Sequence, residues 1–320
     1  MLQQLEKSIL ATVSYYDIFD YPLTAWEIWK WLYDQEKNLP AVSFFQVYSL
    51  LMAKDSVLAG RLESKNGFYF LPNRARIVDL RLENNKVAIR KYKKALRFAK
   101  LLKLCPYIKM IAICNSLSFA NAGDYSDIDF FIIAKKKRIW LARFCANFLP
   151  KFLGIRPTHG DTQDKFCFTF FVTEDNLDLQ RLQIDQDDIY LKFWLTQIQP
   201  VYDPAGCYQK LLSANNWALK CFPNFFPVEL SFHRQVKNGW LSKFFRELIK
   251  FFSVGPLGWL QEKLAKSLQL KILPRYLRKM ANQGNKVVIN DQVLKFHDND
   301  RRLKYKEMFE ERMRQVVSNG

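Results

Sequence analysis

The sequence lacks the patterns that mark several common classes of protein. No run of apolar residues reaches the roughly 18 that a membrane span requires, and the nearest approach, residues 251–260, is interrupted by Gly and Pro. The N-terminal segment carries Glu6 and Asp17 where the apolar part of a secretory signal would be uncharged. None of the six cysteines forms a CxxC pair. We therefore expect a soluble cytoplasmic protein whose cysteines are buried free thiols.

Several catalytic and cofactor motifs are absent as well. The sequence has no Walker loop, no dinucleotide-binding fingerprint and no Ser/His/Asp order. Its three histidines, His159, His233 and His297, lie far apart without metal-ligand spacing. Acidic residues are few beside basic ones, since 31 Asp and Glu against 49 Lys and Arg give a net charge of +18. This balance favours polyanionic partners such as nucleic acid, nucleotides or an acidic membrane surface.

Residues 1–73 are expected to form a small N-terminal domain. Apolar residues recur at helical spacing in three segments, and in the second of them Thr24 and Glu27 have the spacing of a capping box. The Asn-Gly pair at 66–67 then predicts the turn of a β-hairpin. Three helices followed by a hairpin resemble a winged helix. Because the third segment holds a single basic residue, Lys54, contact with a protein and binding of DNA both stay open.

The rest of the chain is expected to form three further parts. Residues 74–104 are predicted to be a basic connecting helix, with 11 Lys or Arg against two acidic residues. Residues 105–205 combine helical segments with three apolar strand-like runs, which is typical of a small mixed sheet. Residues 206–320 are predicted to be mostly helical, and within them 257–280 are basic and amphipathic, so that this segment packs on its own domain or contacts an acidic surface. The predicted strands are 108–114, 127–134 and 165–172.

Two carboxylates stand at the start of the second predicted strand. Residues i and i+2 of a strand point to the same side, so Asp127 and Asp129 are expected to project together while Ile128 enters the core. Two like charges this close repel each other unless a cation lies between them. Mg²⁺ prefers carboxylates together with phosphate oxygens. The preceding polar loop begins at Asn115 and Ser116, where small residues let backbone N–H groups approach a phosphate.

The whole segment NSLSFANAGDYSDIDFFII, residues 115–133, resembles the DNA polymerase β-like nucleotidyltransferase superfamily. Minimal members of that superfamily read approximately G-S-x-A-x-G-x-A-x-x-x-S-D-I-D, followed by apolar residues. The residues on matching positions are Ser116, Ala122, Ser126, Asp127, Ile128 and Asp129. The resemblance implies an α+β fold in which a nucleotidyltransferase domain over 105–205, with a small mixed β-sheet, is flanked by the winged-helix-like domain and the mostly helical C-terminal region.

The resemblance also implies roles for single residues. Asp127 and Asp129 would be catalytic residues and Mg²⁺ ligands, and Asn115, Ser116 and Ser126 would bind the nucleotide. The expected function is transfer of a nucleoside monophosphate from an NTP–Mg²⁺ complex to an acceptor that is a small molecule, a protein side chain or an RNA end. Nucleic acid is a further candidate partner.

The sequence departs from the superfamily pattern at several positions. Asn115 and Ala120 stand where glycines are usual. The third carboxylate, which active members carry on the next strand, is missing from residues 165–172; Asp164 precedes this run, and Glu174 and Asp175 follow it. The alternative function is therefore a catalytically impaired nucleotidyltransferase-fold module that binds nucleotide or nucleic acid in a regulatory role.

Two further acidic clusters are interpreted as helix starts. Asp300, in the segment that also holds His297 and Asp298, is expected to cap a helix that begins just after it. The pair at 187–188 is expected to cap the helix that comes after it in the same way.

Overall fold

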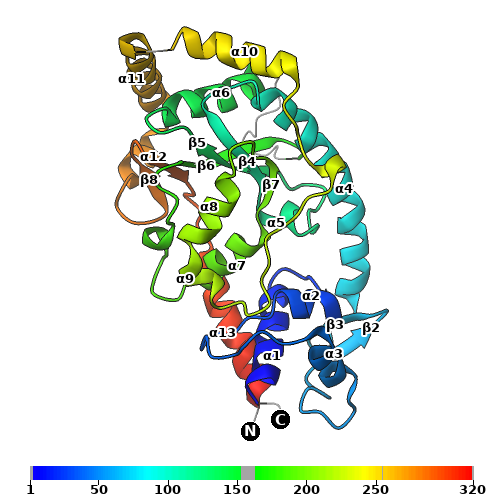
Figure 1. Cartoon of the computed structure of the whole chain (residues 1–320). Coiled ribbons are helices and arrows are strands. Elements are labelled where there is room, and N and C mark those ends of the chain that lie inside the picture. The colour runs from blue at the N-terminus through cyan, green and yellow to red at the C-terminus, as the bar shows by residue number, and fades with distance from the viewer. Residues whose placement is uncertain (1–2, 153–162, 254, 319–320) are drawn as a thin grey trace.

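A six-stranded mixed β-sheet lies at the centre of the molecule (Figure 1). The computed structural model describes residues 3–152, 163–253 and 255–318. The strand order is β7-β4-β5-β6-β9-β8. Among the described residues of this sheet, only β5 and β6 pair in parallel, and the other neighbours are antiparallel. The strands are β4 (Ile108–Ile113), β5 (Ile128–Ala134), β6 (Phe166–Thr173), β7 (Gln199–Tyr202), β8 (Val287–Ile289) and β9 (Val293–Phe296).

Helices cover both faces of this sheet because both faces are apolar. Ile132 and Phe171 belong to one face, which packs against α4, α6, α11 and α12. Phe131 and Val172 belong to the other face, which packs against α7, α8 and α9. Strands buried on both sides read as nearly continuous hydrophobic runs, and for this reason the sequence located β4, β5 and β6 to within one residue at each end. The helices on the two faces are α4 (Arg76–Leu102), α6 (Ile139–Phe152), α7 (Ile189–Gln197), α8 (Cys207–Ala214), α9 (Asn216–Leu219), α11 (Gly255–Ile272) and α12 (Arg275–Met280).

The N-terminal part contains the predicted three helices and hairpin, together with one short extra strand. Its sheet has the order β1-β3-β2. The capping box is present, since Thr24 Oγ1 accepts from the Glu27 amide at 3.3 Å and the Glu27 carboxylate accepts from the Thr24 amide at 2.9 Å. Asn66 and Gly67 both have positive φ, 54° and 78°, as the predicted hairpin turn requires. The elements are α1 (Gln4–Asp17), β1 (Leu23–Thr24), α2 (Ala25–Lys30), α3 (Phe44–Met52), β2 (Glu63–Lys65) and β3 (Phe68–Phe70).

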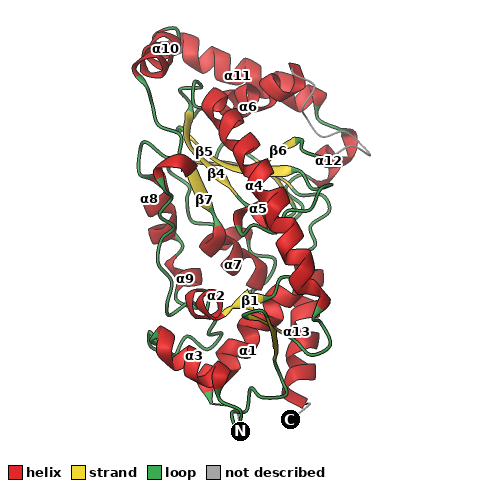
Figure 2. Cartoon of the chain, turned by 90° about the vertical axis from the view of Figure 1, so that its right-hand side faces the viewer, coloured by secondary structure: helices red, strands yellow, loops and turns green. Residues whose placement is uncertain are grey.

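The long helix α4 connects the two parts and runs alongside the sheet (Figure 2). Its apolar stripe, including Tyr92, Ala95 and Phe98, is buried against β4, β5 and β6. Most of its basic residues face away from this stripe, as expected of a solvated helix. One of them, Lys91, is instead fully buried. Its ammonium binds main-chain carbonyls of the loop that leads into β5, so this lysine fixes the approach to that strand.

The region after residue 205 is mostly helical, as predicted, but it also contains a β-hairpin that the sequence analysis did not predict. Val287–Ile289 and Val293–Phe296 form a β-hairpin, and β9 pairs with β6 in the central sheet. The six-stranded sheet therefore takes strands from both sides of the boundary drawn at 205. After the hairpin, α13 (Arg302–Ser318) packs along α1, where Arg312 forms an ion pair of 2.6 Å with Asp17.

The cysteines and the apolar character of the helices can be compared with the predictions made from composition. All six cysteines are free, four of them buried and two half-buried. Within residues 3–152, 163–253 and 255–318, no helix combines the length and the apolar character needed to cross a bilayer. Of the three histidines, His159 lies outside the described residues.

Candidate functional site

The two predicted aspartates point into one cavity. Ile128 and Phe130 are buried on the face of β5 that packs against α4. Asp127 and Asp129 point to the opposite side and line a cavity of about 300 Å³ together with Asn115. A volume of this size is at the lower end of the range for ligand sites. The alternation of side chains in the strand therefore brings both acids to one surface, as the sequence predicted.

Burial raises the pKa values of both carboxyls, and the neighbouring charge of Asp127 raises that of Asp129 further. Asp129 has lost most of its contact with water and lies beside the charge of Asp127, so its pKa rises to about 7. Burial also raises the pKa of Asp127, although a hydrogen bond with Cys167 and the charge of Lys91 oppose the change. Paired acids with raised pKa values in a cavity are typical of functional sites. A cation bound between the two carboxylates would remove the repulsion that raises the pKa of Asp129.

The loop between β4 and β5 has the backbone that its sequence pattern requires. Asn115 and Ala120 have φ of 56° and 60°, in the left-handed region that glycine adopts most easily. These are the two positions at which the superfamily pattern has glycine. Asn115 is further held by its side chain, whose Oδ1 accepts from Tyr190 Oη at 3.2 Å and from Trp194 Nε1 at 3.1 Å. Asn115 also forms a hydrogen bond with the carboxylate of Asp129. This bond partly opposes the rise in the pKa of Asp129.

The other two predicted nucleotide-binding residues, Ser116 and Ser126, do not line this cavity. The Ser126 hydroxyl donates to the Gly123 carbonyl at 2.9 Å and so closes the turn before β5. The ammonium of Lys91 donates to the carbonyls of Asp124 and Ser126. Ser126 therefore shapes the loop that presents the two acids, and its hydroxyl is used within that loop.

None of the three candidate acids completes the site. Asp164 forms ion pairs with Lys91 at 3.2 Å and with Lys94 at 3.6 Å on α4. Glu174 and Asp175 follow the other end of β6, where they pair with lysines at 3.5 and 3.1 Å. From Cys167 to Glu174 a strand extends by roughly 23 Å. None of the three acids lines the cavity, and each forms an ion pair with lysine instead.

A cysteine lies beside the two aspartates, on the strand where the superfamily pattern would carry a third carboxylate. Cys167 is the partner of Asp129 in the β5–β6 register. Its Sγ and one oxygen of each aspartate all lie within 4.8 Å of one another. Burial and the two neighbouring charges raise the pKa of Cys167 well above its ordinary value, so the thiol stays protonated. Two carboxylates suit Mg²⁺, whereas a thiol is not a ligand that this cation prefers.

Sequence reasoning missed the wall of the cavity that comes from the end of the chain. His297 follows β9, and its Nε2 lies 3.0 Å from the hydroxyl oxygen of Thr169, next to Cys167 on the same side of β6. Burial and the nearby charge of Lys295 lower the pKa of His297 to about 3, so its ring is neutral. The apolar runs on either side of Asn290 and Asp291 were the signal that could have predicted a hairpin here, although not its place beside β6.

A buried ion-pair network holds the same wall in place. Asp300 accepts from the Arg302 amide at 3.1 Å, which confirms its predicted role at the start of α13. Its carboxylate also pairs with Lys295 at 3.1 Å and with Arg302 at 2.6 Å. Arg302 reaches Asp188 at 2.6 Å, and Asp188 caps α7 through the Leu191 amide, as predicted. Both basic side chains are thus neutralised within the protein.

Two other side chains of the C-terminal segment border the cavity. Arg301 lines it, is exposed, and has no ion pair within the described part of the chain. The ring of Tyr305 stacks on that of Tyr190 with their centroids 5.4 Å apart. The cavity therefore has an acidic floor, a neutral His297 and one available guanidinium at its edge.

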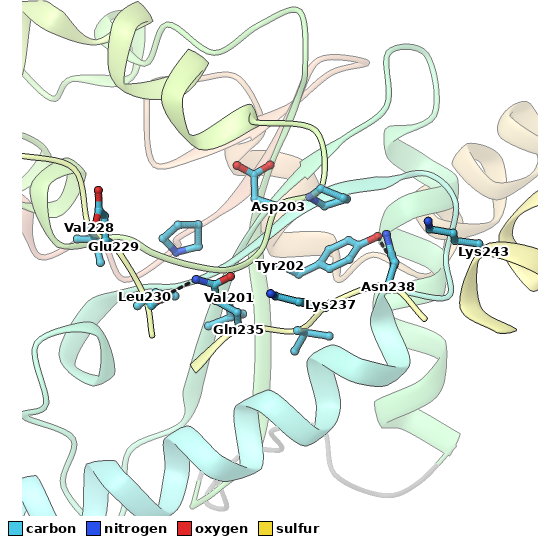
Figure 3. Close-up of a pocket in the computed structure, with 13 residues that line it drawn as sticks. Val201, Tyr202, Asp203, Val228, Glu229, Leu230, Gln235, Lys237, Asn238 and Lys243 are labelled. Carbon is cyan, nitrogen blue, oxygen red and sulfur yellow. Dashed lines mark hydrogen bonds between the residues drawn. The ribbon is translucent and has the colours of Figure 1, made fainter. Parts of the chain in front are cut away.

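A second cavity, of about 750 Å³, lies elsewhere and lacks these features (Figure 3). The carboxylate of Asp203 accepts from the amides of Cys207 and Tyr208 at 2.8 and 2.9 Å, so it caps α8. Tyr202 donates to Asn238 Oδ1 at 3.2 Å (Figure 3). Because these polar groups are satisfied by the fold itself, size alone does not make this cavity the functional site.

Comparisons of the chain with protein-family models, with curated proteins and with solved structures find no match. The superfamily resemblance of residues 115–133 therefore stays a prediction from the sequence. The geometry of the cavity over Asp127 and Asp129 is the main basis on which a function can be proposed.

Proposed function

We propose that the protein binds a nucleoside triphosphate as its Mg²⁺ complex in the cavity over Asp127 and Asp129. The observation that carries the proposal is the pair of acids on one side of β5, within a cavity and with raised pKa values. Mg²⁺, when bound, would screen the two carboxylates from each other and polarise phosphate oxygens. The left-handed backbone at Asn115 and Ala120 and the available guanidinium of Arg301 support a phosphate-bearing ligand.

Nucleotidyl transfer is the reaction that we propose for this site first. Asp127 and Asp129 would hold the cation, Asn115 would orient Asp129, and Arg301 would neutralise phosphate charge. His297 is uncharged and lies on the same side of β6 as Cys167, where its ring can hydrogen-bond an acceptor, but with a pKa of about 3 it is too weak a base to remove the proton of a hydroxyl. A cytoplasmic location belongs to the same proposal, since the proposed ligand is an intracellular nucleotide.

Binding without efficient transfer is the second candidate, and a specific observation favours it. Cys167 occupies the position opposite Asp129, and Asp164, Glu174 and Asp175 are engaged elsewhere. A protonated thiol neither holds a second cation nor removes a proton from an acceptor. Under this candidate the protein is a nucleotide-responsive module.

The N-terminal part is proposed to contact another protein in a winged-helix-like manner, in preference to nucleic acid. Its helix α3 contains no Lys or Arg, although a reader of DNA needs several phosphate contacts. The same helix exposes Phe45 and Met52, with 74% and 57% of their surfaces accessible. Exposed apolar side chains of this kind are more typical of protein contacts.

The test incubates the protein with each labelled NTP and Mg²⁺. Label transfer that is lost in Asp127→Asn/Asp129→Asn supports nucleotidyl transfer, and binding without transfer supports the second candidate. Asp124→Asn is the matched control. Asp124 is an exposed acid in the same loop, and its only ion pair among the described residues is with Arg90. Nucleotide binding that is equally tight in the double variant and in the wild type would refute the proposed site.

A further inference from the structure

The helix α10 (Trp240–Phe251) turns its polar side towards the protein and its apolar side towards solvent, the reverse of an ordinary surface helix. Its buried side is polar, formed by Ser242 and Arg246. The guanidinium of Arg246 donates to main-chain carbonyls before β4, including that of Cys105 at 2.9 Å. A surface helix of a globular protein normally turns its apolar stripe inward and its polar side to solvent. Here the polar side anchors the helix, and the apolar side is left without a partner inside the described chain.

The outward side of α10 is large and aromatic. Trp240 and Phe251 each have 76% of their surface exposed. They belong to a group of apolar residues that share the outward side of α10 and its end, namely Trp240, Phe244, Phe245, Leu248, Phe251 and Phe252. Apolar patches of this extent on a protein surface mark contact with a partner or a membrane.

The next helix in the chain, α11, carries a second exposed apolar row. It packs on α6 through residues such as Ala265 and through Glu262, which accepts from the amides of Trp140 and Leu141. A second row of apolar residues, at helical spacing, stays exposed beside this contact: Leu257, Leu260, Leu264, Leu268 and Ile272. Both α10 and α11 lie across the end of the molecule that is farthest from the two termini, as Figures 1 and 2 show. Two helices with exposed apolar rows therefore lie at the same end of the molecule.

The charge around these helices selects the kind of partner. Residues 240–280 contain nine Lys or Arg and two Glu, a net charge of +7. Of the nine, Arg246 is buried and Lys250 and Lys266 form ion pairs, which leaves six basic side chains without an ion pair among the described residues. Lys263 lies 3.7 Å from the ring centroid of Trp259, so cationic and aromatic groups alternate at the edge of the apolar rows. Helices that lie in a bilayer interface combine an apolar side bearing Trp, Phe and Leu with flanking Lys and Arg. Trp is favoured at the level of the lipid headgroups.

We infer that α10 and α11, flanked by the basic residues of α12, dock peripherally on an anionic phospholipid bilayer. The apolar rows enter the boundary between headgroups and acyl chains, and the basic residues contact lipid phosphates. This inference is independent of the nucleotide site, which lies in the cavity beside β5 and β6.

The first experiment measures co-sedimentation of the full chain with vesicles of phosphatidylcholine alone or mixed equally with phosphatidylglycerol. Binding is expected to the anionic vesicles and to weaken in high salt, because screening shortens the reach of the basic residues. Phe251→Ser/Phe252→Ser should weaken binding at least about tenfold, since two large side chains no longer enter the apolar layer. The matched control is Phe44→Ser/Phe45→Ser, in which exposed aromatic residues change at the opposite end. Circular dichroism and thermal unfolding confirm that each variant folds.

A second pair of variants tests the charge. Lys271→Glu/Lys279→Glu should abolish preference for anionic vesicles, whereas the exposed pair Lys86→Glu/Lys93→Glu on α4 changes the net charge equally and should retain it. The variant Asp127→Asn/Asp129→Asn should bind vesicles as the wild type does. The result for vesicle binding is therefore separate from the result for nucleotide binding. Absence of vesicle binding, or binding that the Phe variants leave unchanged, would overturn the inference. Self-association that Phe251→Ser/Phe252→Ser dissolves, measured by light scattering, would assign the surface to a second copy of the chain and overturn it as well.

Discussion

Replacing Asp129 by Asn is expected to make the protein more stable above pH 7 while removing its response to Mg²⁺. The change keeps the shape of the side chain and the acceptor that Asn115 bonds, but it removes the negative charge that faces Asp127. A substitution at a functional acid that increases stability would indicate that the native carboxylate is retained for a ligand. Its presence is unfavourable in the protein without that ligand.

The magnitude is set by the pKa of Asp129, which is about 7 in the folded protein and about 3.9 in an unfolded chain. Between these two values the folded state binds more protons than the unfolded state, so the free energy of unfolding falls as the pH rises. The full difference of about three pKa units corresponds to about 4 kcal/mol. Because the carboxyl borders a cavity that admits water, we expect a gain of about 2 kcal/mol for Asp129→Asn near pH 8 and almost none near pH 4.

The assay is urea unfolding of wild type and variant across that pH range, in EDTA and then in Mg²⁺. Wild type should gain stability from Mg²⁺ above pH 7, and the variant should gain much less. Asp164→Asn is the control of opposite sign. Burial alone would raise the pKa of Asp164, but Lys91 and Lys94 outweigh it and lower the pKa. Its contribution is present above the unfolded pKa and is lost as the pH falls through the lower folded pKa, so this variant should lose stability at neutral pH. A gain from Asp129→Asn that is equal at both ends of the pH range would refute the electrostatic argument.

Three further substitutions test other parts of the site. Cys167→Asp should destabilise the protein in EDTA by adding a third negative charge, and should tighten Mg²⁺ binding roughly tenfold in calorimetry, equivalent to about 1.4 kcal/mol. Ala120→Gly should stabilise by about 0.5 kcal/mol in urea unfolding, because a left-handed conformation costs Ala about 1–2 kcal/mol and Gly loses part of that gain to entropy. Arg302→Ala should destabilise by about 3–5 kcal/mol in the same assay, since Asp188 would be left as a buried charge without its ionic partner and Asp300 would keep only Lys295.

The sequence predicted those elements whose cause is local. A capping box needs only Thr24 and Glu27, and a tight turn needs only the Asn-Gly pair at 66–67. The central strands were visible because burial on both faces leaves long apolar runs. The hairpin of residues 287–296 was not predicted, because its strands have only three and four residues. Its pairing with β6 spans more than a hundred positions in the chain, and no local pattern reports such a contact.

The same distinction explains which half of the cavity the sequence could find. Asp127 and Asp129 lie two residues apart, so the period of a strand was sufficient to place them together. Cys167 reaches them only through the register of β5 and β6, and His297 only through the register of β6 and β9. Absence of a third acid could be read from the sequence, but the identity of the residue in its place could not.

The residues that line the cavity come from segments that lie far apart in the chain. Its floor comes from the middle of the chain, whereas its opposite wall comes from residues 295–305. Tyr305, at the start of α13, contacts Tyr190 on one side and Phe19 of the N-terminal part on the other, with centroid distances of 5.4 and 5.1 Å. The cavity is therefore complete only when the central sheet and the C-terminal segment are assembled, and Tyr305 links that segment to the N-terminal part. A ligand that fills this cavity must stabilise the docking of the C-terminal segment on the sheet, because it binds only the state in which they meet.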